Sequence, residues 1–284
     1  MKHRIIISFF TLFFLNLQIS FVSASEEVTF MFNPEDKTVM IENTEAVKKE
    51  IVNKETVKSE KSVVKTRIIY NKTQNGFNLV VQPLEIKFKL NNEPVENPVF
   101  DILKESPVIY NIDQKGQFQG LSGYDKIKKL FYENFTEEFA SQIAQIFNKE
   151  KMEQKAEFEW AQKTGSYAGR TVSHKEKWER KEKLNFEQTD PVSFNVVTQF
   201  FLNEKFNEKD CVKIVINYEN EDDKRPFIKG NAVVYTDPDT MNIYSQTMER
   251  TLYFNKKNDK GEEIPAKIYE KREYDYEYRF SVAE

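Results

Sequence analysis

The 284-residue sequence predicts an α+β protein built on a large, curved antiparallel β-sheet, half-barrel-like in form, with one central helix or helix pair packed on it. Three observations predict this fold. Long stretches on both sides of the middle alternate apolar and polar residues with the period of a β-strand. Asn75-Gly76 is a pair that favours a tight hairpin. Only the segment from about 122 to 162 repeats its apolar residues at three- and four-residue steps, as a helix does.

The chain begins with a pattern typical of a secretory signal peptide. Basic residues at 2–4 precede an apolar run, and residues 22–24 form a small-residue cleavage site. We therefore expect residues 1–24 to be a signal peptide and residues 25–284 to be a single α+β domain without a transmembrane segment. Two alternatives remain open. Residues 5–22 nearly reach the length of an uncleaved membrane anchor, and the mature chain could form two β-subdomains joined through the helix.

Charge and cysteine content narrow the function classes. The formal charge of −4 becomes −6 when Lys2 and Arg4 leave with the signal peptide, which argues against a nucleic-acid-binding surface. Cys211 is the one cysteine of the sequence, so no intramolecular disulfide is possible. A chain of this length can be held together by burial alone. These features favour an exported protein, in a bacterial periplasm or secreted, over a eukaryotic secretory one.

The first hundred residues are typical of strands. Residues 27–32 and 38–47 alternate, and the charged stretch 45–62 keeps enough Val and Thr to continue as a strand. After the Asn75-Gly76 reversal, the returning arm keeps one apolar face, with a shift at Pro83. We expect residues 99–103 to form a single helical turn.

Turn and capping signals organise the centre of the chain. Asp113 and Gly116 suit a turn between two short strands, because Asp hydrogen-bonds nearby backbone and Gly accepts a positive φ. Ser122 with Asp125 predicts a capping box at the start of the helix. Residues 134–137 predict a second cap, so the helical segment is expected to bend there.

Five further strands are predicted after the helix. They span residues 194–202, 212–218, 232–236, 241–254 and 267–280. Trp178 is expected to anchor the segment that precedes them. The last strand sets Tyr274, Tyr276, Tyr278 and Phe280 on one face, which is typical either of a cross-strand aromatic ladder or of a surface that binds carbohydrate or lipid.

Residue types suited to catalysis are scarce. His174 is the one histidine left after export, so a His-rich metal site cannot be built. Cys211 with His174 would suit a nucleophile and its base, but Cys211 begins an apolar strand, where a buried structural thiol is commoner. Carboxylate pairs such as Glu157 and Glu159 fall in charged runs typical of solvated faces. We expect no enzymatic activity, no cofactor and no metal site.

The order of motifs resembles a known group of sequences. The motifs are a Phe-x-Pro opening at 30–34, Asn75-Gly76, the Asp113-x-x-Gly116…Ser122-Gly-x-Asp125 module, and Gly169-Arg-Thr-Val172…Lys177-Trp178. This order resembles families of uncharacterised exported bacterial proteins, periplasmic or lipoprotein-type. The chain departs from them in lacking a lipid-bearing cysteine and in having Lys175-Glu176 where a glycine is common. At the level of fold, the expected sheet is similar to the half-barrel of bacterial lipoprotein carriers, which implies a concave face able to hold an acyl chain.

These inferences predict a non-enzymatic exported protein that binds a hydrophobic ligand, a lipid or a lipid-bearing envelope partner in an apolar groove between sheet and helix. The expected groove residues come from the helix and the facing strands: Phe131, Phe135, Phe139, Phe147, Phe88, Phe200 and Ile214. The helical stripe could instead dock on the sheet as ordinary core. The alternative function is an envelope structural or interaction protein with a filled core, which binds a partner by edge pairing.

Overall fold

The computed structural model describes residues 26–186, 189–220, 224–258 and 260–280, so the predicted signal peptide lies outside the described residues. The long strands form one sheet. In chain order they are β2 (Val39–Val52), β3 (Glu55–Thr73), β4 (Gly76–Leu90), β5 (Glu93–Pro94), β6 (Val108–Asp113), β7 (Phe118–Ser122), β9 (Lys177–Phe186), β10 (Thr189–Phe206), β11 (Lys209–Glu219), β12 (Phe227–Thr236), β13 (Ile243–Lys257) and β14 (Glu263–Arg279). A separate two-stranded sheet pairs β1 (Glu27–Thr29) with β8 (Thr171–Ser173).

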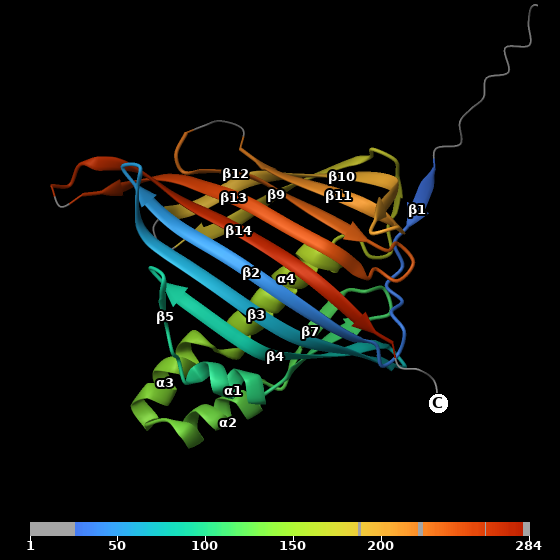
Figure 1. Cartoon of the computed structure of the whole chain (residues 1–284), viewed down its shortest axis with the longest axis horizontal. Coiled ribbons are helices and arrows are strands. Elements are labelled where there is room, and N and C mark those ends of the chain that lie inside the picture. Colours follow the sequence, from blue (N-terminus) through green and yellow to red (C-terminus); the bar gives the residue numbers. More distant parts are fainter. Residues whose placement is uncertain (1–25, 187–188, 221–223, 259, 281–284) are drawn as a thin grey trace, which may run out of the picture.

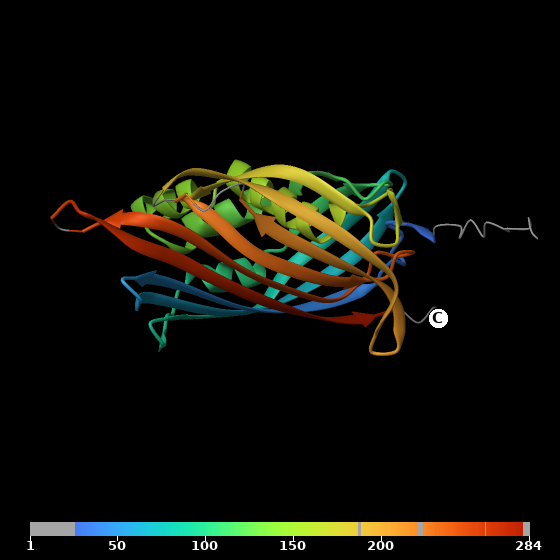
Figure 2. The same ribbon diagram turned by 90° about the horizontal axis from the view of Figure 1, so that it is seen from above.

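The large sheet is antiparallel and open. Its strand order is β7-β6-β4-β3-β2-β14-β13-β12-β11-β10-β9, with β5 beside β4. The chain therefore brings its C-terminal strand β14 against β2, and this pairing joins the two halves of the sequence at the middle of the sheet. Figures 1 and 2 show the sheet curving around its helices. The predicted α+β class with a large curved antiparallel sheet is confirmed.

The helical segment contains three α-helices and a π-helical turn: α2 (Tyr124–Asn134), α3 (Glu137–Ile146), α4 (Lys149–Trp160) and η1 (Ala161–Gly165). A short helix, α1 (Val99–Glu105), precedes it. In Figure 1, α4 crosses the inner side of the sheet, whereas α1, α2 and α3 gather below β4. The bend predicted after α2 is present between α2 and α3.

Of the two turn and capping signals predicted around β7, one is confirmed and one is wrong. The turn between β6 and β7 is confirmed, since Asp113 Oδ1 accepts hydrogen bonds from the backbone N–H groups of Lys115 (2.8 Å) and Gln117 (2.9 Å), and Gly116 has φ +80°. The predicted capping box at Ser122 is wrong. Ser122 ends β7 and accepts a hydrogen bond from Asn111 Nδ2 (3.1 Å), and the left-handed Gly123 is the N-cap of α2.

Hairpin turns fix the register of the long strands. Thr73 pairs with Gly76, so residues 74–75 form the loop of the predicted Asn75-Gly76 reversal. Gly76 is required because a Cβ there would lie 2.1 Å from the carbonyl oxygen of Ile112 on β6. The charged stretch 45–62 is strand as predicted, but it reverses at Asn53-Lys54, where both residues have positive φ. Two positive φ values are what a type I′ hairpin turn needs.

A β-bulge in β4 keeps both of its halves directed into the sheet's concave side. Lys65 pairs with Glu85 but Thr66 pairs with Pro83, which leaves Leu84 as the extra residue. Leu84 is exposed, whereas Val81 before the bulge and Phe88 after it both line cavities on the concave side. The face shift predicted at Pro83 therefore corresponds to this bulge.

Candidate ligand-binding groove

Two adjoining cavities lie between α4 and the concave face of the sheet. The first has a volume of about 250 Å³ and the second about 330 Å³. Five residues line both cavities and mark the junction between them: Glu42, Thr66, Lys155, Glu159 and Lys163. We therefore treat them as one groove with an apolar chamber and a polar chamber. Ligand sites in proteins generally have volumes of about 300–1,000 Å³, a range that the apolar chamber reaches only together with its neighbour.

The apolar chamber is built from alternate residues of the central strands. Because side chains of a strand alternate between faces, β14 directs Tyr276 and Tyr278 inward, and β4 directs Leu79 and Val81 inward. Trp160 closes the chamber from the end of α4. Trp160 is held there by a hydrogen bond from its Nε1 to the carbonyl oxygen of Gly116 (2.8 Å).

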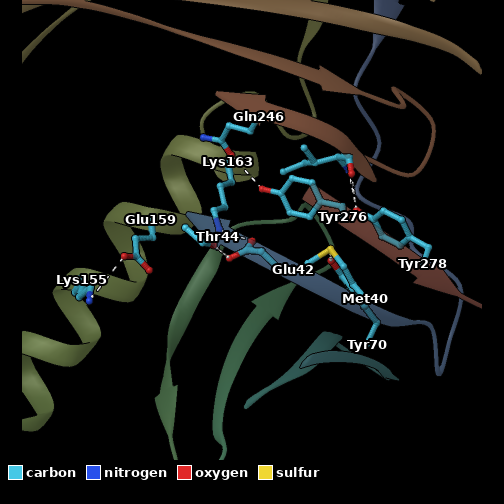
Figure 3. Close-up of polar contacts among 11 residues, drawn as sticks. Met40, Glu42, Thr44, Tyr70, Lys155, Glu159, Lys163, Gln246, Tyr276 and Tyr278 are labelled. Atoms are coloured by element: carbon cyan, nitrogen blue, oxygen red, sulfur yellow. Dashed lines mark hydrogen bonds and ion pairs between the residues drawn. The ribbon is translucent and has the colours of Figure 1, made fainter. Parts of the chain in front are cut away.

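The chamber tyrosines point their rings into the cavity and bond their hydroxyls to neighbouring groups (Figure 3). Tyr278 donates to the carbonyl oxygen of Ile243 (3.1 Å) and accepts from its N–H (2.9 Å). Tyr276 donates to Gln246 Oε1 (3.2 Å). Burial raises the pKa of both tyrosines well above the ordinary value, and Glu42 adds to the effect. The rings therefore present neutral surface at physiological pH.

A buried ion pair stands where the two chambers meet. Lys163 Nζ lies 2.6 Å from Glu42 Oε2, and the two side chains are only 18% and 9% exposed. The same Nζ lies 4.7 Å from the centroid of the Tyr274 ring. Burial alone would lower the pKa of Lys163, but the Glu42 carboxylate and the neighbouring Tyr274 and Glu159 raise it above its ordinary value. Lys163 is therefore positively charged, and its contact with Glu42 ties η1 to β2 (Figure 3).

The polar chamber contains a second ionic cluster, on β13 and β14. Glu270 accepts from Arg250 Nε (2.8 Å) with one carboxylate oxygen and from Arg272 Nε (2.7 Å) with the other. Burial alone would raise the pKa of Glu270, but the two guanidinium groups lower it below its ordinary value. The Glu270 carboxylate therefore balances the charge of only one of the two arginines. Of these two, Arg272 lines the polar chamber.

The structure separates the seven residues predicted to line a groove. Phe131 is fully buried and Phe135 and Phe147 partly so, in a cluster formed by α1, α2 and α3 with Ala156 of α4 and residues of β6 and β7. Phe139 is 42% exposed on α3. The helices of residues 124–146 therefore bury their stripe at one end of the sheet, and α4 is the helix that crosses the groove.

Of the three strand residues predicted to line the groove, one does so and two do not. Phe88 lines the polar chamber. Phe200 and Ile214 are fully buried in the main core, where Phe200 packs against Trp178 with ring centroids 4.5 Å apart, and neither lines the groove. The predicted meeting of the helical phenylalanines with Phe200 and Ile214 across a groove is wrong.

The aromatic row predicted on the last strand forms part of the groove. The alternation of Tyr274, Tyr276 and Tyr278 on one face is present, and all three line the groove. Phe280, grouped with them, is 53% exposed. Lys163 with Glu42 was missed, because nothing in the sequence links two residues 121 positions apart.

Cys211 and His174 are engaged in structural contacts. Burial raises the pKa of Cys211 to about 11, and the thiol donates to the carbonyl oxygen of Glu204 (3.5 Å). His174 Nδ1 accepts from the backbone N–H of Leu202 (3.1 Å). Within the described ranges, no group of three or more His, Cys, Asp or Glu side chains is placed to hold a metal ion.

Comparison with known proteins shows a likeness of fold only. No protein-family model matches the chain, and no curated protein matches it by sequence. Among solved structures, lipovitellin, in a structure described for its lipid–protein interactions, matches with a TM-score of 0.51 and 10% identity. The match covers 89% of this chain but only 26% of the lipovitellin chain, so this chain spans about a quarter of that protein. In the part of the chain that the structure describes, no helix has the length and apolar character needed to cross a bilayer.

Proposed function

We propose that this protein is a non-enzymatic, exported carrier that binds a hydrophobic ligand or the lipid of a lipid-bearing partner in the groove beneath α4. The observation that carries the proposal is the apolar chamber itself, lined by tyrosine rings and aliphatic side chains between helix and sheet. Apolar walls with a few fixed polar groups are typical of sites for small hydrophobic molecules. The lipovitellin likeness supports the proposal at the level of fold.

The apolar chamber adjoins the polar chamber, which we propose as the entry route for the ligand. The cover is held on the sheet by apolar contacts of Trp160 and Ala156 and by polar contacts, among them Lys163 with Glu42. Leu121 N–H also donates to Glu153 Oε1 of α4 (3.0 Å), which secures the start of the same helix to β7.

Binding of an apolar fluorophore tests the proposal. The dye N-phenyl-1-naphthylamine brightens in apolar surroundings, and we expect it to saturate one site per chain. Thr66 lines both chambers, so Thr66→Trp fills their junction and is expected to abolish the signal. Lys65→Trp is the matched control, because it places the same side chain on the opposite face of β3. The absence of saturable binding, or equal loss in both variants, would contradict the proposal.

A second function has its own supporting observation. Large apolar side chains are exposed on the helices outside the sheet: Tyr132 (44%), Phe139 (42%) and Ile146 (65%). Such side chains favour contact with an envelope partner. Under this alternative, Phe139→Ser with Ile146→Ser would abolish partner capture and leave dye binding intact.

A further inference from the structure

The two chambers differ in chemistry, and the difference specifies a class of ligand. We propose that the groove binds a single-chain amphiphile with an anionic oxygen headgroup, its chain in the apolar chamber and its headgroup beside Arg272 and Lys48. This inference rests on the proposed function and adds the chemical class of the ligand to it. It is carried by the charges of the polar chamber, whose acidic side chains are all engaged while two of its cations retain free donors.

Each carboxylate in the polar chamber has a cation of its own. Glu42 is bound by Lys163 (2.6 Å), Glu270 by both arginines, and Glu60 by Lys58 (2.6 Å). Glu159 has Lys155 at 3.9 Å. The four cationic and four acidic side chains that line the chamber balance. Two partners from outside the lining, Arg250 on Glu270 and Lys58 on Glu60, then leave two positive charges in excess, in a chain whose formal charge is −4.

The donors left over belong to Arg272 and Lys48. A guanidinium has five N–H donors. Arg272 directs its Nε and Nη2 to Glu270 (2.7 and 2.6 Å) and also bonds Tyr274, so only its remaining N–H groups are left for a ligand. Lys48 is exposed at the rim of the chamber and forms no ion pair with any described residue. Glu270 holds Arg272 in place, so its planar fork is already oriented for the two oxygens of a carboxylate or a phosphate.

The length of the groove matches one acyl chain. Tyr278, Tyr276, Tyr274 and Arg272 follow one another on the inner face of β14, from the apolar end to the cationic end. Six residues of strand span about 20 Å at roughly 3.3 Å per residue. The hydrocarbon core of a bilayer, about 30 Å across, allows about 15 Å for each chain. A chain of that length, with its headgroup at Arg272, therefore runs along this row through the polar chamber and past the Glu42–Lys163 junction, and its end lies in the apolar chamber.

The test compares three fluorescent ligands that share one chain: an 18-carbon fatty acid, its methyl ester, and the corresponding lysophosphatidylglycerol. We expect the acid to bind at least tenfold more tightly than the ester at pH 7.5. Charge-assisted hydrogen bonds of this kind are worth roughly tenfold to a hundredfold in affinity, so Arg272→Gln should weaken the acid by that factor and change the ester less than twofold. Lys48→Gln, at an exposed position, should act in the same direction without a risk to folding.

Lys271→Gln is the matched control, since it removes one positive charge from the adjacent residue on the outer face of β14, where Lys271 pairs with Glu273 (2.6 Å). Tighter binding of the lysophospholipid than of the acid would identify a phosphate headgroup, and the reverse a carboxylate. Equal affinities for acid and ester, or equal losses in Arg272→Gln and Lys271→Gln, would overturn the inference and leave the proposed function standing. Failure of all three ligands to bind would overturn both.

Discussion

Replacing Lys163 with methionine tests whether the Glu42–Lys163 pair holds the helical cover on the sheet. The substitution keeps most of the length of the side chain and removes its charge, which leaves the Glu42 carboxyl group 9% exposed and without its cation. Removing one partner of a buried ion pair costs about 3–5 kcal/mol, because the remaining charge is left uncompensated. We expect Lys163→Met to lower the free energy of unfolding by that amount.

The double variant Glu42→Met/Lys163→Met distinguishes the cost of leaving one charge unpaired from the net contribution of the ion pair to the free energy of unfolding. Exchanging both partners for apolar groups is often neutral or stabilising by about 1–4 kcal/mol, so the double variant should be more stable than Lys163→Met alone. Lys155→Met is the control on the same helical segment, and its side chain is 75% exposed. We expect it to change stability by under about 0.5 kcal/mol.

Equilibrium unfolding in urea, followed by tryptophan fluorescence and by far-ultraviolet circular dichroism, measures all four proteins. Trp160 lines the groove three residues before Lys163, so its fluorescence reports on whether the helical cover stays packed on the sheet. A loss below about 1 kcal/mol in Lys163→Met would refute the reasoning. So would a double variant no more stable than Lys163→Met.

Three further predictions follow from the described contacts. Burial raises the pKa of Tyr276 and Tyr278, so these tyrosines ionise at a lower pH in the unfolded chain than in the folded one. Their contribution to the free energy of unfolding should therefore be complete below about pH 10, the ordinary tyrosine pKa, and be lost as pH rises further. A urea midpoint unchanged from pH 8 to 11 would contradict this. The lowered pKa of Glu270 contributes stability that is present above about pH 4.3 and lost as pH falls through the folded-state pKa, so Glu270→Gln should flatten the acid limb of the same curve. Asn148→Ala should cost about 1 kcal/mol, since Asn148 Oδ1 accepts from Lys151 N–H (2.8 Å) as the N-cap of α4; an unchanged urea midpoint would exclude this cap contribution. The sequence adds the last one: if the proposed signal peptide is removed, N-terminal sequencing of the protein from its native cells should begin at Ser25, and an intact Met1 would favour the uncleaved anchor.

Much of the sheet could be predicted because alternation is a local property. The row from Tyr274 to Tyr278 needs only a strand to bring its rings to one side, and the shift at Pro83 is visible in the apolar residues around it. The turn at Asn53-Lys54 was missed for a related reason. Its residues lack the glycine that marks such turns, and the alternation continues on both sides of it.

The groove itself depends on contacts that no local pattern encodes. The stripe of α2 and α3 is amphipathic, so it was expected to face the concave groove, whereas the structure buries it against other helices and residues of β6 and β7 at one end of the sheet. The helix that does cross the sheet, α4, is mostly charged, because most of its side chains are exposed and two that line the groove, Lys155 and Glu159, are themselves charged. A polar lining gives a weak apolar period, so the covering helix could not be recognised from periodicity alone.

A crystal structure of the chain with the 18-carbon fatty acid bound tests the central claim most directly. The claim predicts continuous ligand density between α4 and the concave face, running from Tyr278 to Arg272, with the carboxylate within about 3 Å of the guanidinium. Density over the exposed side chains of α3, or a groove filled by repacked side chains with the ligand elsewhere, would contradict it.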